Sequence, residues 1–203
     1  MGTNEIIAVI DAGGRKNIGW VIVDSEGAPS RQATGSKTLD EFAKVLAKHL
    51  NEGRTVSLGI EAPLYLPIAS DQDTINSARD GEGNRAWSAA SGAAVTPLGV
   101  HQLAYVLKHL KNECIESPPV TFDLSSADPG LKLWEAFISG ADKADSHEGD
   151  ALVAIEAYRN RGDESALASE GPVINLAGAA TIAAGLSTDG ELVRTPCFVV
   201  RPA

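Results

Sequence analysis

Three acidic residues mark the boundaries of predicted elements and could together bind a metal ion. Asp11 closes the apolar run 6–10, and Glu61 closes a second run that starts at Thr55. Asp150 lies in the first turn of a helix predicted later in the chain. An ionised carboxylate at the end of a buried strand is costly to desolvate. Each acid alone is also explained by a helix cap or a lysine partner, so the set of three is the informative feature.

The two strand-end acids lie close together if their strands are neighbours in one sheet. Like charges held at short range need a cation between them, or one of them must take up a proton. Oxygen atoms are the ligands that magnesium and manganese prefer. Asp11, Glu61 and Asp150 therefore predict a site for Mg²⁺ or Mn²⁺.

A histidine accompanies the third acid on the same predicted helix. His147 precedes Asp150 by three residues, and positions three apart share one face of a helix. Both side chains are therefore expected to point toward the strand ends. Asp145 and Glu148 are better explained as the N-cap and third helical residue of a capping box than as metal ligands.

The elements that must position these residues begin with a regular pattern. Thr38 and Glu41 have the spacing of a capping box at the start of a helix. The first sixty residues predict the order strand, strand, strand, helix, strand, at 6–10, 18–24, 28–35, Thr38 to Gly53, and 55–60.

The rest of the chain predicts further elements after an irregular insert around residues 62–98. The insert contains three prolines, although 76–91 could be partly helical. The later pattern predicts a helix at 100–112, a short strand at 120–122, a short helix at 131–138, helices at 147–160 and 175–186, and a final strand at 192–200. With no internal repeat or linker, residues 1–203 are expected to form a single domain.

Composition and charge limit the function classes that remain open. The 203 residues are 43% hydrophobic, which is enough for a folded core, and the two cysteines exclude a disulfide scaffold or a cysteine-rich zinc module. A formal net charge of −10 repels phosphate, so an anionic substrate would need a local basic patch or bound cations. The apolar stretch 173–186 is too short to cross a membrane, and no signal peptide is recognised, so a cytoplasmic protein without a membrane partner is expected.

The order of elements and acids resembles the ribonuclease H-like nuclease fold. In that fold the first and fourth strands and a late helix carry the acids. The segment His147-Glu-Gly-Asp150-Ala-Leu-Val-Ala-Ile is similar to the closing helix of RuvC-type Holliday-junction resolvases. The resemblance implies an α/β, three-layer fold with a mixed central sheet of about five strands, helices on both faces, and an extra C-terminal helix and strand.

Several short motifs are also similar to a bacterial and archaeal family described only as predicted nucleases of this fold. These motifs are Asp11 followed by Gly19-Trp20, Glu61-Ala-Pro-Leu, Arg85, Asn175-Leu-x-Gly-Ala-Ala, and Arg194-Thr-Pro-Cys. The resemblance covers most of the chain in pattern and is specific at about four of these motifs.

The resemblance implies two-metal hydrolysis of a phosphodiester. Asp11 would bridge both ions, Glu61 and Asp150 would each hold one, and His147 would be a ligand or would orient the water. Lys143 is the preferred candidate to neutralise the scissile phosphate, although a solvated surface lysine explains it equally well.

Further basic residues are candidates for substrate binding. Arg15 and Lys16 lie close to Asp11 in the sequence and are alternative partners for the scissile phosphate. In the insert, Arg79 and Arg85 lie near Trp87 and could clamp a phosphate or stack on a base. The simpler interpretation pairs both arginines with nearby acids and places the tryptophan in the core.

The 17 basic residues form no long run, which disfavours duplex or junction DNA and favours a short or single-stranded nucleic acid or a small nucleotide. Two other functions remain open at this point. The strand-Asp-x-Gly-strand opening at Asp11 loosely fits the actin-like ATPases and sugar kinases, which need two such domains. A non-catalytic binding or assembly module is the other alternative, since the small-residue helix 175–186 could pack against a partner, including a second copy of the chain.

Overall fold

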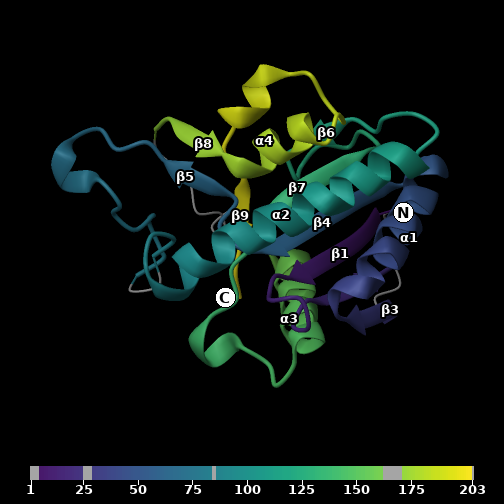
Figure 1. Cartoon of the computed structure of the whole chain (residues 1–203), viewed down its shortest axis with the longest axis horizontal. Helices are drawn as coiled ribbons and strands as arrows, with labels where there is room; N and C mark the ends of the chain where they lie inside the picture. The colour runs from purple at the N-terminus through teal and green to yellow at the C-terminus, as the bar shows by residue number, and fades with distance from the viewer. Residues whose placement is uncertain (1–4, 25–28, 84–85, 162–170, 203) are drawn as a thin grey trace.

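The computed structural model describes residues 5–24, 29–83, 86–161 and 171–202, and it is an α/β structure with a mixed central sheet (Figure 1). The central sheet contains β1 (Glu5–Asp11), β2 (Gly19–Val23), β3 (Pro29–Thr34), β4 (Thr55–Glu61), β6 (Val120–Thr121), β7 (Leu131–Ala136) and β9 (Phe198–Val200). The described α-helices are α1 (Leu39–Asn51), α2 (Ala90–Glu113), α3 (His147–Asn160) and α4 (Leu176–Ala183). A separate two-stranded sheet pairs β5 (Tyr65–Pro67) with β8 (Val173–Asn175).

The order of strands across the central sheet is β3-β2-β1-β4-β7-β6, and β9 also pairs with β7. The first three strands form an antiparallel meander, whereas β4 is parallel to both β1 and β7. This arrangement places the carboxyl ends of β1, β4 and β7 along one edge of the sheet. Within the described residues the sheet has seven strands rather than the predicted five or so.

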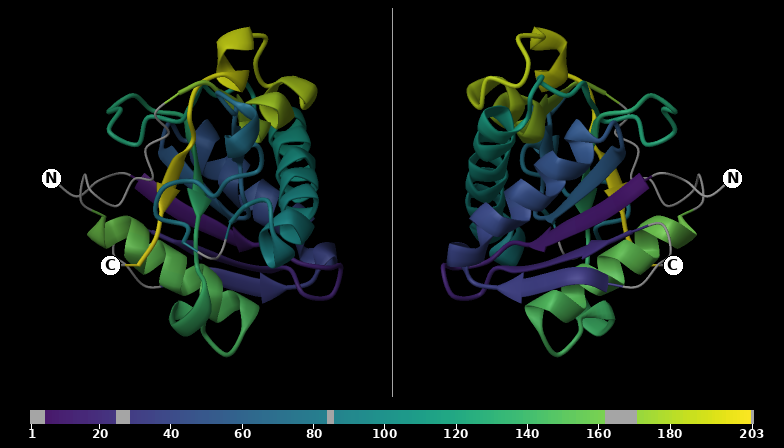
Figure 2. Two further views of the ribbon diagram at one scale, coloured as in Figure 1. Left: turned by 90° about the vertical axis from the view of Figure 1, so that its left-hand side faces the viewer. Right: turned by 90° about the vertical axis from the view of Figure 1, so that its right-hand side faces the viewer.

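Helices cover both faces of the sheet, as Figure 2 shows. Alternate residues of β1 point to opposite sides: Ile6, Ala8 and Ile10 join the core under α1, α2 and α4. Ile7 and Val9 join the smaller core under α3. Such continuous apolar runs are typical of strands that are buried on both faces. The small residues of α4 pack inside this chain, since α4 lies against α2 and its Ala177 and Ala180 belong to the larger core.

The prediction of a helix at 131–138 is wrong, because this segment forms strand β7. All six residues of the strand are buried, including Lys132 and Glu135. Lys132 and Glu135 are three positions apart, a spacing that also fits one face of a helix, so a pattern this short does not separate a strand from a helix. Pairing with β4 on one edge and with β6 and β9 on the other fixes the segment as a strand.

Two predicted capping boxes are also wrong. The side chain of Thr38 makes no cap to α1; its hydroxyl instead accepts a hydrogen bond from Trp20 Nε1 at 2.8 Å and donates one to the Gly35 carbonyl at 2.7 Å. The N-cap of α3 is Ser146, whose Oγ accepts from the Gly149 amide at 3.1 Å, rather than Asp145.

Three boundaries differ from the sequence prediction. Helix α2 starts at Ala90, ten residues before the predicted start, and includes Pro97. The predicted helix 175–186 is shorter, because Asn175 ends β8 and caps α4 through its side chain. The predicted strand 192–200 is limited to Phe198–Val200 and follows a 3₁₀ turn at Gly190–Val193. In its described residues, 62–83 and 86–98, the insert is irregular apart from β5, the start of α2 and the 3₁₀ turn Gln72–Thr74.

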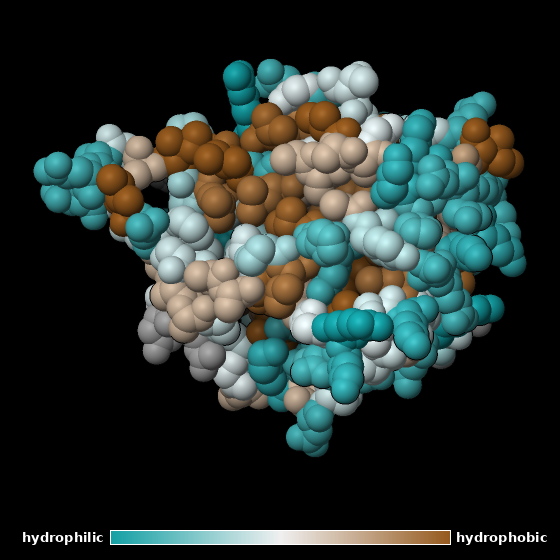
Figure 3. Space-filling model, viewed as in Figure 1, coloured by the Kyte–Doolittle hydropathy of each residue, from teal (hydrophilic) through white to brown (hydrophobic). Residues whose placement is uncertain are grey.

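The surface differs between the two ends of the molecule in the view of Figure 3. Apolar side chains gather over β5, β8 and the N-terminal half of α2, where Ile68, Leu98 and Ile174 are exposed. The side that carries α1 is largely hydrophilic. Among the described residues, no helix is both long enough and apolar enough to traverse a lipid bilayer.

Candidate metal centre

The carboxyl ends of β1 and β4 place two acids side by side. Asp11 and Glu61 are the last residues of their strands, and the parallel register puts them directly opposite each other. Asp11 is 3% exposed, and the Glu61 side chain is 12% exposed. The expectation that neighbouring strands bring these two carboxylates together is therefore confirmed.

The third acid reaches the same edge because α3 begins very close to β2. Gly19, which pairs with Asp11 across the β1–β2 ladder, lies beneath the first residue of the helix. A Cβ atom at Gly19 would lie 2.5 Å from the carbonyl carbon of His147, so a larger residue would push the helix away. One ligand oxygen from each of Asp11, Glu61 and Asp150 lies within 4.8 Å of the other two.

Lys143 and the backbone around it hold Asp150 in place. The Lys143 ammonium donates hydrogen bonds to Glu61 Oε1 and to Asp150 Oδ2, both at 3.0 Å. The amide of Ala144 donates to Asp150 Oδ1 at 2.6 Å. The lysine that the sequence singled out thus lies among the acids and is not a detached surface residue.

His147 lies against the first acid. Its Nδ1 contacts Asp11 Oδ2, while 40% of the histidine side chain remains exposed. His147 and Asp150 both occupy the first turn of α3, as their spacing predicted. The N-terminus of a helix carries a partial positive charge, which favours a carboxylate there.

Burial and mutual repulsion shift the proton affinity of these groups. Burial raises the pKa of Asp11 to about 6, although the Glu61 carboxyl and Lys143 oppose the shift. Burial and the adjacent Asp11 carboxyl together raise the pKa of Glu61 to about 9. Partial burial would lower the pKa of Lys143, but Glu61 and Asp150 outweigh it and raise the value to about 12.

The donor set fits a hard divalent cation. Three carboxylates meet with one ammonium group, so the cluster keeps an excess of negative charge. Within the described part of the chain, the buried Glu61 Oε2 has no hydrogen-bond partner. A buried carboxylate oxygen without a partner is costly, and an oxygen-seeking cation such as Mg²⁺ or Mn²⁺ would satisfy it.

A cavity of about 180 Å³ continues from the acids toward α2 and β7. Asp11, Glu61, Lys143 and His147 contribute to one side of it. The cluster is therefore open to a small molecule or to part of a larger one.

The predicted substrate-binding residues lie in different parts of the structure. Arg15 and Lys16 are exposed in the turn between β1 and β2, a few residues beyond Asp11. Arg79 is 6% exposed and forms its ion pairs with Glu82 and Glu135, which are not acids of the cluster. The prediction for Arg85 lies outside the described residues.

A buried ion-pair network, which the sequence analysis missed, occupies Arg79. Its guanidinium binds Glu135 through two hydrogen bonds of 2.5 and 2.8 Å, and it also binds Glu82 at 2.7 and 2.8 Å. The Leu64 amide donates to Glu135 at 2.8 Å. Pairing with Glu82 agrees with the simpler interpretation of Arg79. Glu135 could have been noticed as an acid within the mostly apolar segment 131–138. The prediction of a helix there did not indicate that this acid is buried.

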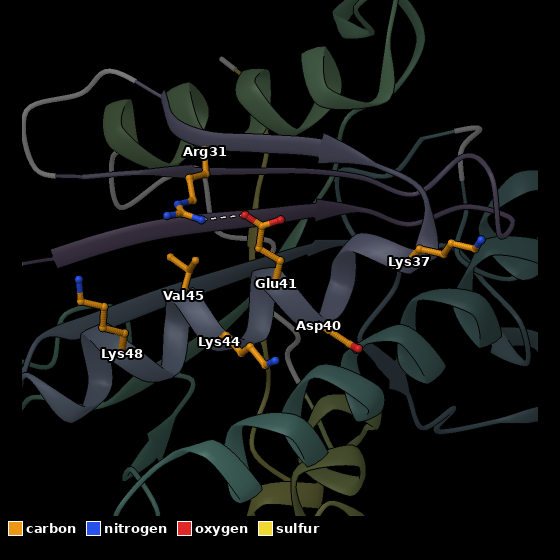
Figure 4. Close-up of a pocket in the computed structure, with 7 residues that line it drawn as sticks. All are labelled: Arg31, Lys37, Asp40, Glu41, Lys44, Val45 and Lys48. Atoms are coloured by element: carbon orange, nitrogen blue, oxygen red, sulfur yellow. Dashed lines mark hydrogen bonds and ion pairs between the residues drawn. The ribbon is translucent and has the colours of Figure 1, made fainter.

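A shallow groove beside α1 gathers basic side chains, as Figure 4 shows. Its volume is about 480 Å³, and it is lined by Arg31, Lys37, Asp40, Glu41, Lys44, Val45 and Lys48. Arg31 pairs with Glu41 at 2.7 Å. Lys37 and Lys44 have no ion-pair partner among the residues that the structure describes. The groove is therefore a local basic area on a protein of net charge −10.

Comparisons of this chain with protein-family models, with curated proteins and with solved structures find no match. The functional assignment depends on the carboxylate cluster and its surroundings.

Proposed function

We propose that this protein is a metal-dependent phosphodiester hydrolase, a nuclease with a ribonuclease H-like fold. The observation that carries the proposal is the convergence of Asp11, Glu61 and Asp150 from two strand ends and a helix start, with ligand oxygens within 4.8 Å. The proposed ions are Mg²⁺ or Mn²⁺. The order of β1 to β4 with α1 between β3 and β4, followed by an acid-bearing α3, supports the fold assignment.

The chain's own residues have distinct roles in the proposed reaction. Asp11, Glu61 and Asp150 would hold the cations, which when bound activate water and neutralise a phosphodiester. His147 is positioned by its contact with Asp11, and its exposed ring can accept a proton from the attacking water.

Lys143 would have two roles in the proposed site. It offsets the charges of Glu61 and Asp150. Its side chain is 47% exposed, so the ammonium could also donate a hydrogen bond to a phosphate oxygen of a bound substrate. This double role explains why a lysine lies in the centre of an acidic cluster.

Basic residues near the cluster favour a short or single-stranded nucleic acid as substrate. Arg15 and Lys16 lie in the turn beside Asp11, and the carbonyl of Arg15 accepts a hydrogen bond from the Ser36 amide at 3.0 Å. That bond joins the turn to the segment that leads into the basic groove of α1. Such a small basic area can follow one phosphate backbone, whereas a duplex or a four-way junction needs a broader surface.

The proposal is tested by titrating Mn²⁺ into the parent protein and into Asp11→Asn and Asp150→Asn variants by calorimetry. Loss of a direct ligand is expected to weaken binding by at least about 100-fold, the upper end of the effect seen for supporting residues. Asp128→Asn is the matched control, since Asp128 is exposed and lies outside the cluster. Equal Mn²⁺ binding by all four proteins would contradict the site.

Hydrolysis is measured in parallel with short single-stranded DNA and RNA oligonucleotides in Mg²⁺ and Mn²⁺. Cleavage that requires the metal and disappears in Asp11→Asn is the expected result. Metal binding with no cleavage of either nucleic acid would overturn the hydrolase and favour a non-catalytic binding module.

A further inference from the structure

The cavity beside the metal centre has a second wall with a different chemistry. This wall is formed by Pro63 after β4, Val95 of α2, and Phe137 and Ile138 after β7. Ile138 is buried, and Val95 and Phe137 are half-buried and pack against the larger core. An apolar wall therefore faces the same space as the carboxylate cluster.

Two hydroxyl groups contribute polar atoms to this cavity. Ser91 at the start of α2 and Ser139 after β7 both line it. Neither side chain forms a hydrogen bond with another described residue. Each hydroxyl can donate one hydrogen bond and accept others, so together they suit a ligand whose rim carries both donors and acceptors.

Charge and volume restrict the ligand. Glu135 also lines the cavity, but its carboxylate is engaged by Arg79. Lys143 and His147 are the basic residues among the lining residues, and both lie at the carboxylate cluster. An anionic group is therefore disfavoured on the apolar side. A volume of about 180 Å³ is several times the ~30 Å³ share of one water molecule and below the ~300 Å³ at which drug-sized sites begin. The space suits one flat, neutral, heteroaromatic ring system.

We propose that this cavity binds the nucleobase next to the scissile phosphodiester. The inference rests on the proposed function, because the carboxylate cluster is what places a phosphodiester at the mouth of the cavity. The apolar wall packs against the faces of the base, and the two serines bond its edge. The base must be unpaired and unstacked to enter, which costs a few kcal/mol in a duplex and less in a single strand. The preferred substrate is accordingly a nucleotide or a single strand with an exposed base.

The test uses neutral nucleosides as probes in metal-free buffer, so that it does not depend on catalysis. Saturation-transfer NMR is recorded with adenosine, guanosine, cytidine, uridine and ribose. Base protons are expected to receive the strongest transfer, and ribose alone is expected to receive little. Phe137→Leu keeps an apolar side chain but loses the ring, and is expected to weaken nucleoside binding about tenfold, as stacking energies imply. Phe137→Tyr is expected to retain binding.

Two controls separate the cavity from general effects on folding. Val95→Trp fills the cavity without removing an apolar contact, and it is expected to abolish nucleoside transfer. Leu98→Ala changes an exposed residue of α2 that does not line the cavity, and it is expected to leave binding unchanged. Thermal unfolding of each variant confirms that it is folded.

The outcomes distinguish this inference from the proposed function. Equal transfer to ribose and to nucleosides, or nucleoside binding that survives both Phe137→Leu and Val95→Trp, would overturn the base site. If the parent hydrolyses phosphodiesters with Mn²⁺ but binds no nucleoside, the base site fails and the hydrolase stands. If nucleosides bind while Mn²⁺ does not, the hydrolase fails and the cavity remains a base-binding site.

Discussion

Two clusters of buried acids lie at neighbouring strand ends, and they are built in opposite ways. The first consists of Glu82 and Glu135 around Arg79, with the three side chains 0%, 1% and 3% exposed. Its carboxylates also accept hydrogen bonds from the amides of Leu64, Trp87 and Arg79. The second consists of Asp11, Glu61 and Asp150 around Lys143, whose side chain is 47% exposed.

The difference lies in how completely the charges are satisfied. In the Arg79 cluster, two acids share a guanidinium that binds both through several hydrogen bonds, and backbone amides supply further donors. In the carboxylate cluster, the Lys143 ammonium bonds to Glu61 and Asp150 but not to Asp11, and Glu61 Oε2 has no partner within the described residues. A saturated buried ion pair is typical of a structural role, whereas shifted proton affinities beside a cavity are typical of a functional site.

The position of the Arg79 cluster indicates its structural role. Arg79 belongs to the irregular insert, Glu135 belongs to β7, and the residue that pairs with Glu135 across the sheet is Ile60, just before Glu61. The Arg79 guanidinium also lies over the ring of Tyr65, 4.4 Å from its centre. The Arg79 cluster thus fixes the insert to the sheet beside the candidate metal centre.

The largest expected effect is the loss of protein stability when the Arg79 cluster is broken. Arg79→Met leaves two buried carboxylates without their cation and is expected to cost about 3–5 kcal/mol of unfolding free energy. Chemical denaturation measures it. Arg31→Met is the matched control, because the exposed Arg31–Glu41 pair is expected to contribute about 0–1 kcal/mol. A loss below 1 kcal/mol for Arg79→Met would remove the distinction between the two clusters.

The same substitution in each cluster is expected to act with opposite sign. Glu135→Gln weakens charged hydrogen bonds to Arg79 and is expected to cost about 1.5–3 kcal/mol. Glu61→Gln removes the repulsion between this side chain and Asp11. It is therefore expected to raise the free energy of unfolding of the metal-free protein at pH 9 by about 1 kcal/mol, a typical gain for a stabilising substitution. Chemical denaturation of both variants measures the two changes in unfolding free energy. Destabilisation by both substitutions would show that Glu61 also has a structural role.

The first of these clusters was harder to find from the sequence than the second. Asp11 and Glu61 each interrupt an apolar run at its end, so their positions in the sheet follow from the pattern, and three-residue spacing on one helix joins His147 to Asp150. Glu135 stands inside an apolar run, and its partner Arg79 is 56 residues earlier in an irregular segment. Only the tertiary structure shows that these two residues form an ion pair.

The approach of α3 to the sheet was likewise beyond the sequence pattern. Lys143 could be suggested as a site residue because it precedes the acidic helix, but its bonds to two of the three acids depend on how the preceding loop folds. The absence of a side chain at Gly19 lets α3 begin against β2. The Gly19-Trp20 motif and the predicted strand do not indicate that a helix packs on this glycine.

A third expectation concerns the pH dependence of metal-free stability. The folded-state pKa is raised for Asp11, to about 6, and for Glu61, to about 9. The folded protein therefore binds more protons than the unfolded chain between the ordinary and the raised values. Stability is expected to fall as the pH rises from about 5 to 9. The slope of unfolding free energy against pH measures it.

Two further measurements test whether the carboxylate cluster causes this decline of stability with pH. Glu61→Gln removes the larger shift, so the variant is expected to show a shallower decline than the parent. Mn²⁺ binds only the ionised cluster of the folded protein and is expected to flatten the decline further. Identical slopes for the parent and Glu61→Gln, or a parent that gains stability over this range, would contradict the assignment.

The smallest expected effect separates Lys143 from the acids that surround it. Lys143→Gln removes an ammonium that competes with cations for Glu61 and Asp150, so Mn²⁺ affinity is expected to rise by about three- to tenfold, a modest effect because a half-exposed charge is strongly screened. Hydrolysis is expected to fall in the same variant, since the donor for the phosphate is lost. Lys44→Gln, in the α1 groove, is the control and should leave Mn²⁺ affinity unchanged. If Lys143→Gln instead weakened Mn²⁺ binding, the lysine would be a support for the acids, as Arg79 is for Glu82 and Glu135, and the contrast between the two clusters would be one of degree.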